Sequence, residues 1–340
     1  MPIFMIGTQR SGSNLLRLML NELPGVAAPH PPHILQRLAP LVPGYGDLGR
    51  DDNFMLLVDD VCRLIELNPV PWERVTLNRA DILGRCRERS LVAVFGAAYD
   101  VLAEAWGART WCCKSLANIA YLDEIERYFG DDAKYIYLYR DGRDVACSFR
   151  KAVVGEKHFY HIAREWAAAQ RRALAHRRRV PAPRFFSLSY EDLIGKPEET
   201  AKRICRFLDV PFDRSMLEYY QSEEAKHAAQ QSNLWANVVR PIMSDNSLKF
   251  LSEATDEDVR IFESVAGEVL DELGYERACL LRGQELKFTP ADIERFNAEN
   301  HRLKGEVQKN TDAADRERRD RQDALLKEIR MRTGAAAHVA

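Results

Sequence analysis

The first twenty residues constrain the fold of this chain more than any other stretch. An apolar segment at residues 3–6 runs into a glycine, four residues follow, and Gly12 then precedes an apolar helical pattern. A strand, a glycine-rich turn and a helix in this order predict a phosphate-binding loop, because the first N–H groups of the helix face the turn. Ser13 and Asn14 stand where the nucleoside-triphosphatase loop has lysine and a hydroxyl, and Arg10 is the loop's only cation.

Strand and helix patterns alternate along most of the chain. Short segments rich in β-branched and aromatic residues predict strands at 3–6, 110–113, 135–139 and 184–188. Apolar spacing of three and four residues predicts helices at 14–22, 92–106, 119–128, 143–151, 161–179 and 197–208. This alternation predicts an α/β fold with a mostly parallel sheet flanked by helices, whose ligand binds beyond the carboxyl ends of the strands.

Two segments depart from the alternation. Prolines and the glycine-rich stretch "PGYGDLGRDDN" interrupt residues 38–80, which we interpret as a lid or a substrate-binding insertion in a domain spanning 1–283. Thr289 as N-cap and Pro290 at the first helical position predict one long, charged helix over residues 288–332. Its decaying apolar pattern fits a solvated tail or a docking helix that mediates self-association.

Bulk composition narrows the classes of protein. The chain has 340 residues, is 46% hydrophobic and carries a net charge of -2, so it has a full core and no overall attraction to nucleic acid. No apolar run approaches the roughly 18 residues of a membrane span, and the N-terminus lacks the pattern of a signal peptide. Seven cysteines without a CxxC motif indicate reduced thiols. We therefore expect a cytoplasmic protein without a metal site.

A second strand–turn–helix pattern, "KYIYLYRDGRDVACSFRK", lies at residues 134–151. Arg140 stands at the end of the strand, and Ser148 lies eight residues later in the helix. A guanidinium and a hydroxyl placed in this way can converge on one anion. Two anion sites at two strand ends predict a ligand with phosphate groups at two places.

Together these motifs resemble those of the sulfotransferases that use 3'-phosphoadenosine 5'-phosphosulfate (PAPS). In that family the first loop, here "QRSGSN" at residues 9–14, holds the 5'-phosphosulfate, and the Arg…Ser segment holds the 3'-phosphate. Family loops place their cation before Ser-Gly and need no magnesium, which explains the missing lysine. The resemblance implies a P-loop-like fold, transfer of a sulfuryl group from PAPS to a hydroxyl acceptor, and release of PAP. The acceptor is left open among small molecules, sugars and peptide tyrosines.

Further segments resemble the tyrosylprotein branch most closely, over residues 1 to about 277. "TWCCKS" supplies Lys114, which matches a lysine at the sulfuryl group, and "SLSYEDLIG" supplies Tyr190, which lies by the adenine in that family. "QQSNLWANVVRPIMSDNSLKF" supplies Ser232 and Lys249, with a spacing two residues longer than usual. "ESVAGEVLDELGYE" resembles the closing helix of bacterial members. The resemblance thus assigns to the donor Arg10, Ser11, Gly12, Ser13, Asn14, Leu15, Arg140, Ser148, Tyr190, Ser232 and Lys249.

The same resemblance implies how the chemistry is divided. Arg10 and Lys114 neutralise charge that builds on the sulfuryl and bridging oxygens during in-line transfer. The family's two usual base positions hold Leu116 and Pro31 here, but His30 and His33 flank the second. A neutral histidine is a suitable base near pH 7, and the prolines before His33 predict that it lies in the first turn of a helix. We therefore favour His33 over His30, although either histidine also fits a purely local hydrogen-bonding role.

Two other functions remain in view. A P-loop nucleotide kinase needs a lysine after Gly12 and a magnesium ligand, and Ser13 argues against it. A non-catalytic protein that binds PAP or another nucleotide is compatible with the absence of the usual bases.

Overall fold

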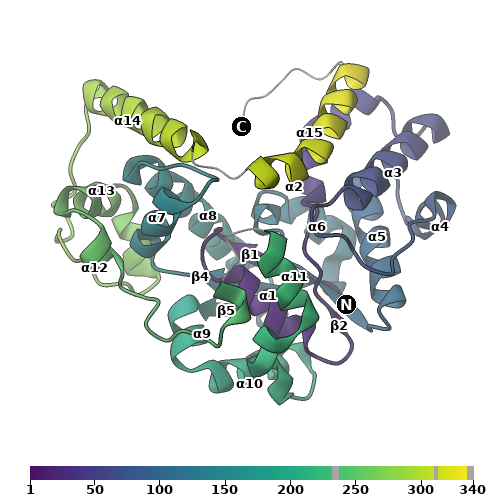
Figure 1. Cartoon of the computed structure of the whole chain (residues 1–340), viewed down its shortest axis with the longest axis horizontal. Coiled ribbons are helices and arrows are strands. Elements are labelled where there is room, and N and C mark those ends of the chain that lie inside the picture. The colour runs from purple at the N-terminus through teal and green to yellow at the C-terminus, as the bar shows by residue number, and fades with distance from the viewer. Residues whose placement is uncertain (232–236, 310–312, 335–340) are drawn as a thin grey trace.

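Five parallel strands form the centre of the molecule, in the order β2–β3–β1–β4–β5 (Figure 1). The structure is a computed structural model that describes residues 1–231, 237–309 and 313–334. The strands are β1 (Ile3–Gly7), β2 (Val26–Ala27), β3 (Thr110–Cys113), β4 (Lys134–Tyr139) and β5 (Phe185–Ser189). The predicted parallel α/β sheet is confirmed. Strand β2 was not predicted, because two residues are too few to show a pattern.

Helices cover both faces of the sheet. The α-helices are α1 (Ser13–Asn21), α2 (Ile34–Leu38), α3 (Asp51–Glu66), α4 (Arg79–Arg85), α5 (Leu91–Ala105), α6 (Leu122–Phe129), α7 (Gly142–Lys151), α8 (Phe159–Arg179), α9 (Tyr190–Gly195), α10 (Pro197–Leu208), α11 (Glu223–Gln231), α12 (Phe250–Glu253), α13 (Asp256–Glu272), α14 (Pro290–Lys309) and α15 (Ala313–Thr333). The 3-10 helices are η1 (Ala39–Tyr45), η2 (Leu116–Ala120), η3 (Gly130–Asp132), η4 (Ala182–Arg184) and η5 (Arg214–Gln221). Among the described residues, no helix is long and apolar enough to cross a membrane.

The alternation of side chains along β1 divides the core between the two faces. Phe4 and Ile6 belong to a large cluster with residues of α3, α5 and α6, whereas Ile3 and Met5 belong to a second cluster with residues of α1 and α10. A strand buried on both faces must be apolar throughout, which is why "IFMI" shows no polar residue. The buried sheet therefore holds the β1–α1 loop in place at the carboxyl end of its central strand.

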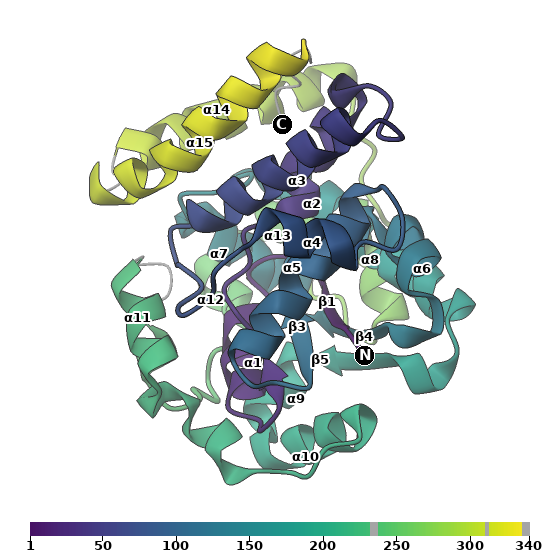
Figure 2. The same ribbon diagram turned by 90° about the vertical axis from the view of Figure 1, so that its right-hand side faces the viewer.

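Residues 38–80 contribute to the core instead of forming an open flap. Helix α3 buries Phe54, Val61 and Ile65 in the same cluster as Phe4, and it lies beside α5 in Figure 2. The prolines and glycines that hid this segment from prediction lie in η1, in the turn before α3 and in the loop between α3 and α4.

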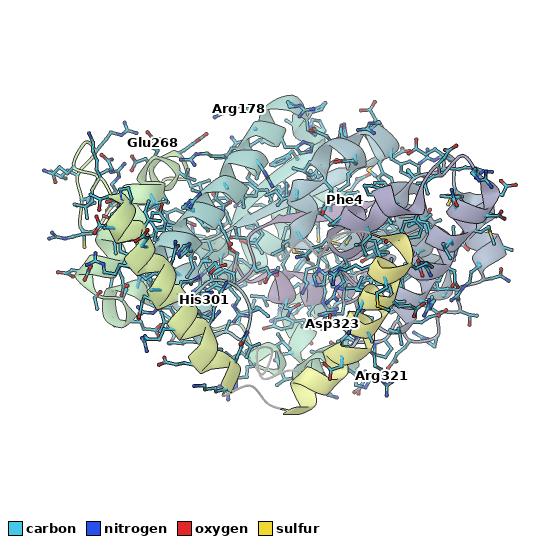
Figure 3. All side chains as sticks on the ribbon, turned by 90° about the horizontal axis from the view of Figure 1, so that it is seen from above. Phe4, Arg178, Glu268, His301, Arg321 and Asp323 are labelled. Carbon is cyan, nitrogen blue, oxygen red and sulfur yellow. The ribbon has the colours of Figure 1, made fainter. Side chains whose placement is uncertain are left out.

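The charged C-terminal segment forms two helices, α14 and α15, where one long helix was predicted. Thr289 and Asp292 cap α14 as expected: Asp292 N donates to Thr289 Oγ1 (3.2 Å), and Thr289 N donates to Asp292 Oδ2 (3.0 Å). The two helices diverge from each other in Figures 1 and 3, and Figure 3 labels His301 on α14 and Asp323 on α15. Each helix buries apolar side chains on the domain, so this segment packs as part of the molecule rather than as a solvated tail.

Candidate active site

The loop between β1 and α1 has the backbone that an anion site needs. Gly12 is the N-cap of α1 with φ 87°, and no side chain of the described residues caps this helix, so its first N–H groups are open to a ligand. A Cβ at Gly12 would lie 2.3 Å from the Tyr190 ring. Glycine is therefore required twice, once by the left-handed backbone and once by the packed tyrosine.

A cavity of about 290 Å³ opens beyond β1 and β4. Most residues predicted to bind the donor line it: Arg10, Gly12, Ser13, Asn14, Leu15, Arg140, Ser148, Tyr190 and Lys249. Ser11 does not, because its buried hydroxyl forms a hydrogen bond with Thr8 Oγ1 (3.0 Å). Ser232 lies outside the described residues.

Arg140 is held by several contacts at the wall of this cavity. Its Nη1 donates to the Arg10 carbonyl oxygen (3.2 Å), and its Nη2 donates to Asp144 (3.2 Å) and to the Asn246 carbonyl oxygen (2.8 Å). The guanidinium also stacks on the Tyr190 ring at 4.4 Å, and its side chain is only 7% exposed. A guanidinium fixed in this way is pre-oriented for a phosphate group.

The two sequence motifs meet in one site because β1 and β4 are neighbours. Arg10 Nε donates to Ser148 Oγ (2.9 Å), so the cation of the first loop reaches the hydroxyl of the second motif. Burial, together with the nearby Arg140 charge, lowers the pKa of Arg10. Two guanidiniums confined together favour an anion between them.

Lys114 and His33 form a second group beside the loop. Lys114 follows β3 and donates to Asn14 Oδ1 (2.7 Å), and burial with the charge of Arg17 lowers its pKa to about 7. His33 Nδ1 forms a hydrogen bond with Ser115 Oγ (2.9 Å), and its ring lies 6.4 Å from that of His30. Burial and the Lys114 charge lower the pKa of His33 to about 3 and that of His30 well below its usual value. Both histidines are therefore neutral at pH 7.

The predicted helical placement of His33 is wrong. Helix α2 begins at Ile34, and His33 precedes it as the N-cap with φ 57°, in the left-handed region. A residue before proline avoids the helical conformation, which disfavours a helix start at His30 or Pro31, and residues 28–33 have no regular secondary structure. The left-handed turn fixes the direction of His33 through the backbone instead of through a helix.

Comparison with known proteins identifies the family. A sequence profile described as "Sulfotransferase family" matches residues 2–214, which is more than half of the chain. The chain belongs to the sulfotransferase family. Transfer of a sulfonate group is the general activity that this membership supports, and the protein is accordingly a transferase.

Relatives and solved structures agree with this family. The sulfotransferase is 24% identical over 285 residues to "Protein-tyrosine sulfotransferase A" of Caenorhabditis elegans, covering 81% of this chain and 67% of the relative. It is 23% identical over 282 residues to "Protein-tyrosine sulfotransferase" of Drosophila melanogaster, covering 81% of this chain and only 51% of that protein.

Two solved domains share the fold. The "Sulfotransferase Domain from the Curacin Biosynthetic Pathway" superposes with a TM-score of 0.58 at 21% identity, covering 81% of this chain and 98% of the domain. The "Sulfotransferase Domain from the Synechococcus PCC 7002 Olefin Synthase" superposes with a TM-score of 0.52 at 22% identity, covering 78% of this chain and 94% of that domain.

The sulfotransferase site also contains residues that the sequence analysis missed. Asp144 accepts hydrogen bonds from Arg140 and from Phe250 N (3.0 Å). Its position four residues after Arg140 could have indicated an ion pair from the sequence. Asn246 Nδ2 donates to Tyr190 Oη (2.6 Å) across the cavity. Arg17, fully buried within the apolar run "LLRLML", donates to the Ala28 carbonyl oxygen and forms an ion pair with Glu224 (2.6 Å).

Proposed function

We propose that this protein transfers the sulfuryl group of PAPS to a hydroxyl acceptor. The observation that carries the proposal is the convergence of Arg10, Arg140 and Ser148 in one cavity at the N-terminus of α1. PAPS carries a phosphosulfate at one end of its ribose and a phosphate at the other, so it needs anion-binding groups from two strand ends.

The charges of the cavity suggest how the donor is oriented. The phosphosulfate lies at the first N–H groups of α1, where Ser13 and Asn14 add polar side chains. The 3'-phosphate lies at Arg140 and Ser148, and the adenine lies beside Tyr190. In this orientation no magnesium ion is needed, because arginines and backbone dipoles neutralise the phosphates.

Lys114 and Arg10 stabilise the transferring group. Lys114 is within hydrogen-bonding distance of Asn14, a residue of the first turn of α1, so its ammonium group lies next to the proposed phosphosulfate site. Negative charge that moves onto the bridging oxygen as the sulfur–oxygen bond breaks is stabilised by both cations.

His33 takes the proton of the acceptor hydroxyl in this proposal. In the donor-free protein burial, and to a lesser extent the Lys114 charge, lowers the pKa of His33 and weakens it as a base. The negative charges of a bound donor offset the charge of Lys114, so His33 becomes more basic when PAPS is in place. The proposal assigns the tautomer in which Nδ1 donates to Ser115 Oγ, so that Nε2 is the nitrogen that accepts the proton.

The names of the relatives suggest which class of acceptor to test first. The names of the curated relatives specify protein tyrosine as an acceptor for those proteins. A phenolic hydroxyl is therefore the first acceptor to test, followed by sugar and aliphatic hydroxyls.

Two measurements test the proposal. PAP is expected to raise the melting temperature without magnesium, and ATP to do so far less, because only PAP has the second phosphate for Arg140. Purified protein with PAPS and a panel of hydroxyl compounds should then yield sulfated products detectable by mass. A larger stabilisation by magnesium-ATP than by PAP would contradict the proposal, whereas PAP binding without any turnover would indicate a non-catalytic binding protein.

A further inference from the structure

Helix α15 packs against α3 and η1, and it also contacts α2, the helix that begins after His33. Leu325, Leu326 and Ile329 of α15 are buried in the main hydrophobic core, and Gln322 Nε2 donates to the Leu64 carbonyl oxygen of α3 (2.8 Å). Figures 1 and 2 show α15, in yellow, alongside α3 and above α2. The helix lies outside residues 2–214, which the family profile matches.

The contact is centred on a buried carboxylate. Asp60 of α3 has a side chain with 0% exposure, and it accepts a hydrogen bond from Tyr45 Oη (2.5 Å). Arg332 of α15 forms an ion pair with the same Asp60 oxygen, while Arg63 is farther away at 3.5 Å from the other oxygen. A carboxylate removed from water requires a close counter-charge, and α15 supplies the nearer one.

This carboxylate is connected to the site through a short stretch of chain. Tyr45 ends η1, η1 follows α2 directly, and α2 begins at the residue after His33. Asp323 of α15 also contacts α2, through Arg37 Nη1 at 3.4 Å. Helix α15 therefore contacts the last turn of α2 as well as the carboxylate that binds the end of η1.

We propose that Arg332 is a positioning residue for the acceptor site: through Asp60 and Tyr45 it fixes the α2–η1 segment and thereby the place of His33. This rests on the proposed function, which puts the acceptor at His33. The donor cavity is built from other elements, namely the β1–α1 loop, α7, α9 and the chain before α12. Loss of the Arg332 contact should therefore impair use of the acceptor and leave donor binding intact.

The test compares Arg332→Met with Lys327→Met, which removes a positive charge from an exposed position of the same helix. Hydrogen exchange is measured over residues 34–66, PAP affinity by calorimetry, and turnover with PAPS and two acceptors, 4-nitrophenol and a tyrosyl peptide. We expect Arg332→Met to lose protection in residues 34–66 and to lower kcat/KM for the acceptor about 10- to 100-fold, with PAP affinity within about twofold of wild type. Lys327→Met should match wild type.

Two further variants separate positioning from general damage. Arg332→Lys keeps the charge and should recover most of the acceptor kcat/KM. Asp60→Asn combined with Arg332→Met removes the uncompensated buried charge and should recover thermal stability even if Arg332→Met alone folds poorly.

Specific results would overturn the inference. Unchanged exchange in residues 34–66, or a loss of PAP affinity equal to the loss of acceptor kcat/KM, would show that Arg332 does not position the acceptor site. If the wild-type protein turns over neither acceptor, the proposed function fails for these phenols. The positioning role of Arg332 can still be tested separately, because unchanged hydrogen exchange in Arg332→Met would overturn it without any turnover measurement.

Discussion

The affinity for PAP should fall steeply as the pH rises above 7, and Lys114 should be the cause. Burial and the charges of Arg17 and Arg10 lower the pKa of Lys114 to about 7 in the donor-free protein. A bound 5'-phosphate beside Asn14 favours the ammonium form and returns its pKa toward that of an ordinary lysine. The complex therefore holds one more proton than the free protein, and by linkage its affinity falls as the pH rises.

The magnitude follows from the fraction of Lys114 that is already protonated. With a pKa of about 7 that fraction is one half at pH 7 and about one in a hundred at pH 9, so PAP affinity should fall about 50-fold over this range. At pH 8 binding should take up about 0.9 proton. The phosphates of PAP are almost fully ionised throughout, because their second pKa is near 6.

Calorimetry in buffers of different ionisation enthalpy measures both quantities. Lys114→Met should bind PAP more weakly at pH 7 and show a flat profile up to pH 9. Lys202→Met, which alters a half-exposed lysine on α10, should keep the slope of the wild type. An affinity of the wild type that stays constant between pH 7 and pH 9 would refute the link between Lys114 and the donor phosphate.

Three substitutions test the rest of the site. Arg140→Ala should weaken PAP binding by about 1.5–3 kcal/mol in calorimetry and change binding of adenosine 5'-phosphosulfate little; equal losses would mean that Arg140 acts through the Arg10 carbonyl. His33→Ala should lower kcat about 10²–10⁴-fold with PAP affinity unchanged, with His30→Ala as its control, and normal turnover by both would exclude a histidine base. Gly12→Ala should abolish the PAP-induced thermal shift, because the new Cβ would lie 2.3 Å from the Tyr190 ring; a normal shift would show that the ring can move.

The sheet and the donor cavity were predictable because local pattern determines them. β3 has the predicted bounds, 110–113, and the anion-binding residues stand at strand ends, where a parallel sheet brings them together. Their grouping in one cavity follows from the adjacency of β1 and β4, which two similar strand–turn–helix motifs suggest.

The acceptor side was less predictable because long-range packing determines it. The left-handed backbone of His33 depends on how the chain turns after three prolines, and no periodic pattern encodes that turn. In sequence Asp60 looks like an ordinary acidic residue of a helix, because its partner Arg332 is 272 residues away along the chain. A charged segment near the end of a chain looks like a solvated tail in sequence, since few apolar residues dock it: in the described part of α15 the buried ones are Leu325, Leu326 and Ile329.

In the proposed mechanism, the charges around the loop link donor binding to acceptor activation. Burial and a neighbouring positive charge lower the pKa of two cations of the site, with Arg140 beside Arg10 and Arg17 beside Lys114. Burial, followed by the Lys114 charge, lowers the pKa of His33 to about 3. In that mechanism an anionic donor offsets the Lys114 charge and thereby raises the pKa of His33, although burial still lowers it. The proposed site would therefore activate an acceptor hydroxyl better after the donor has bound than before.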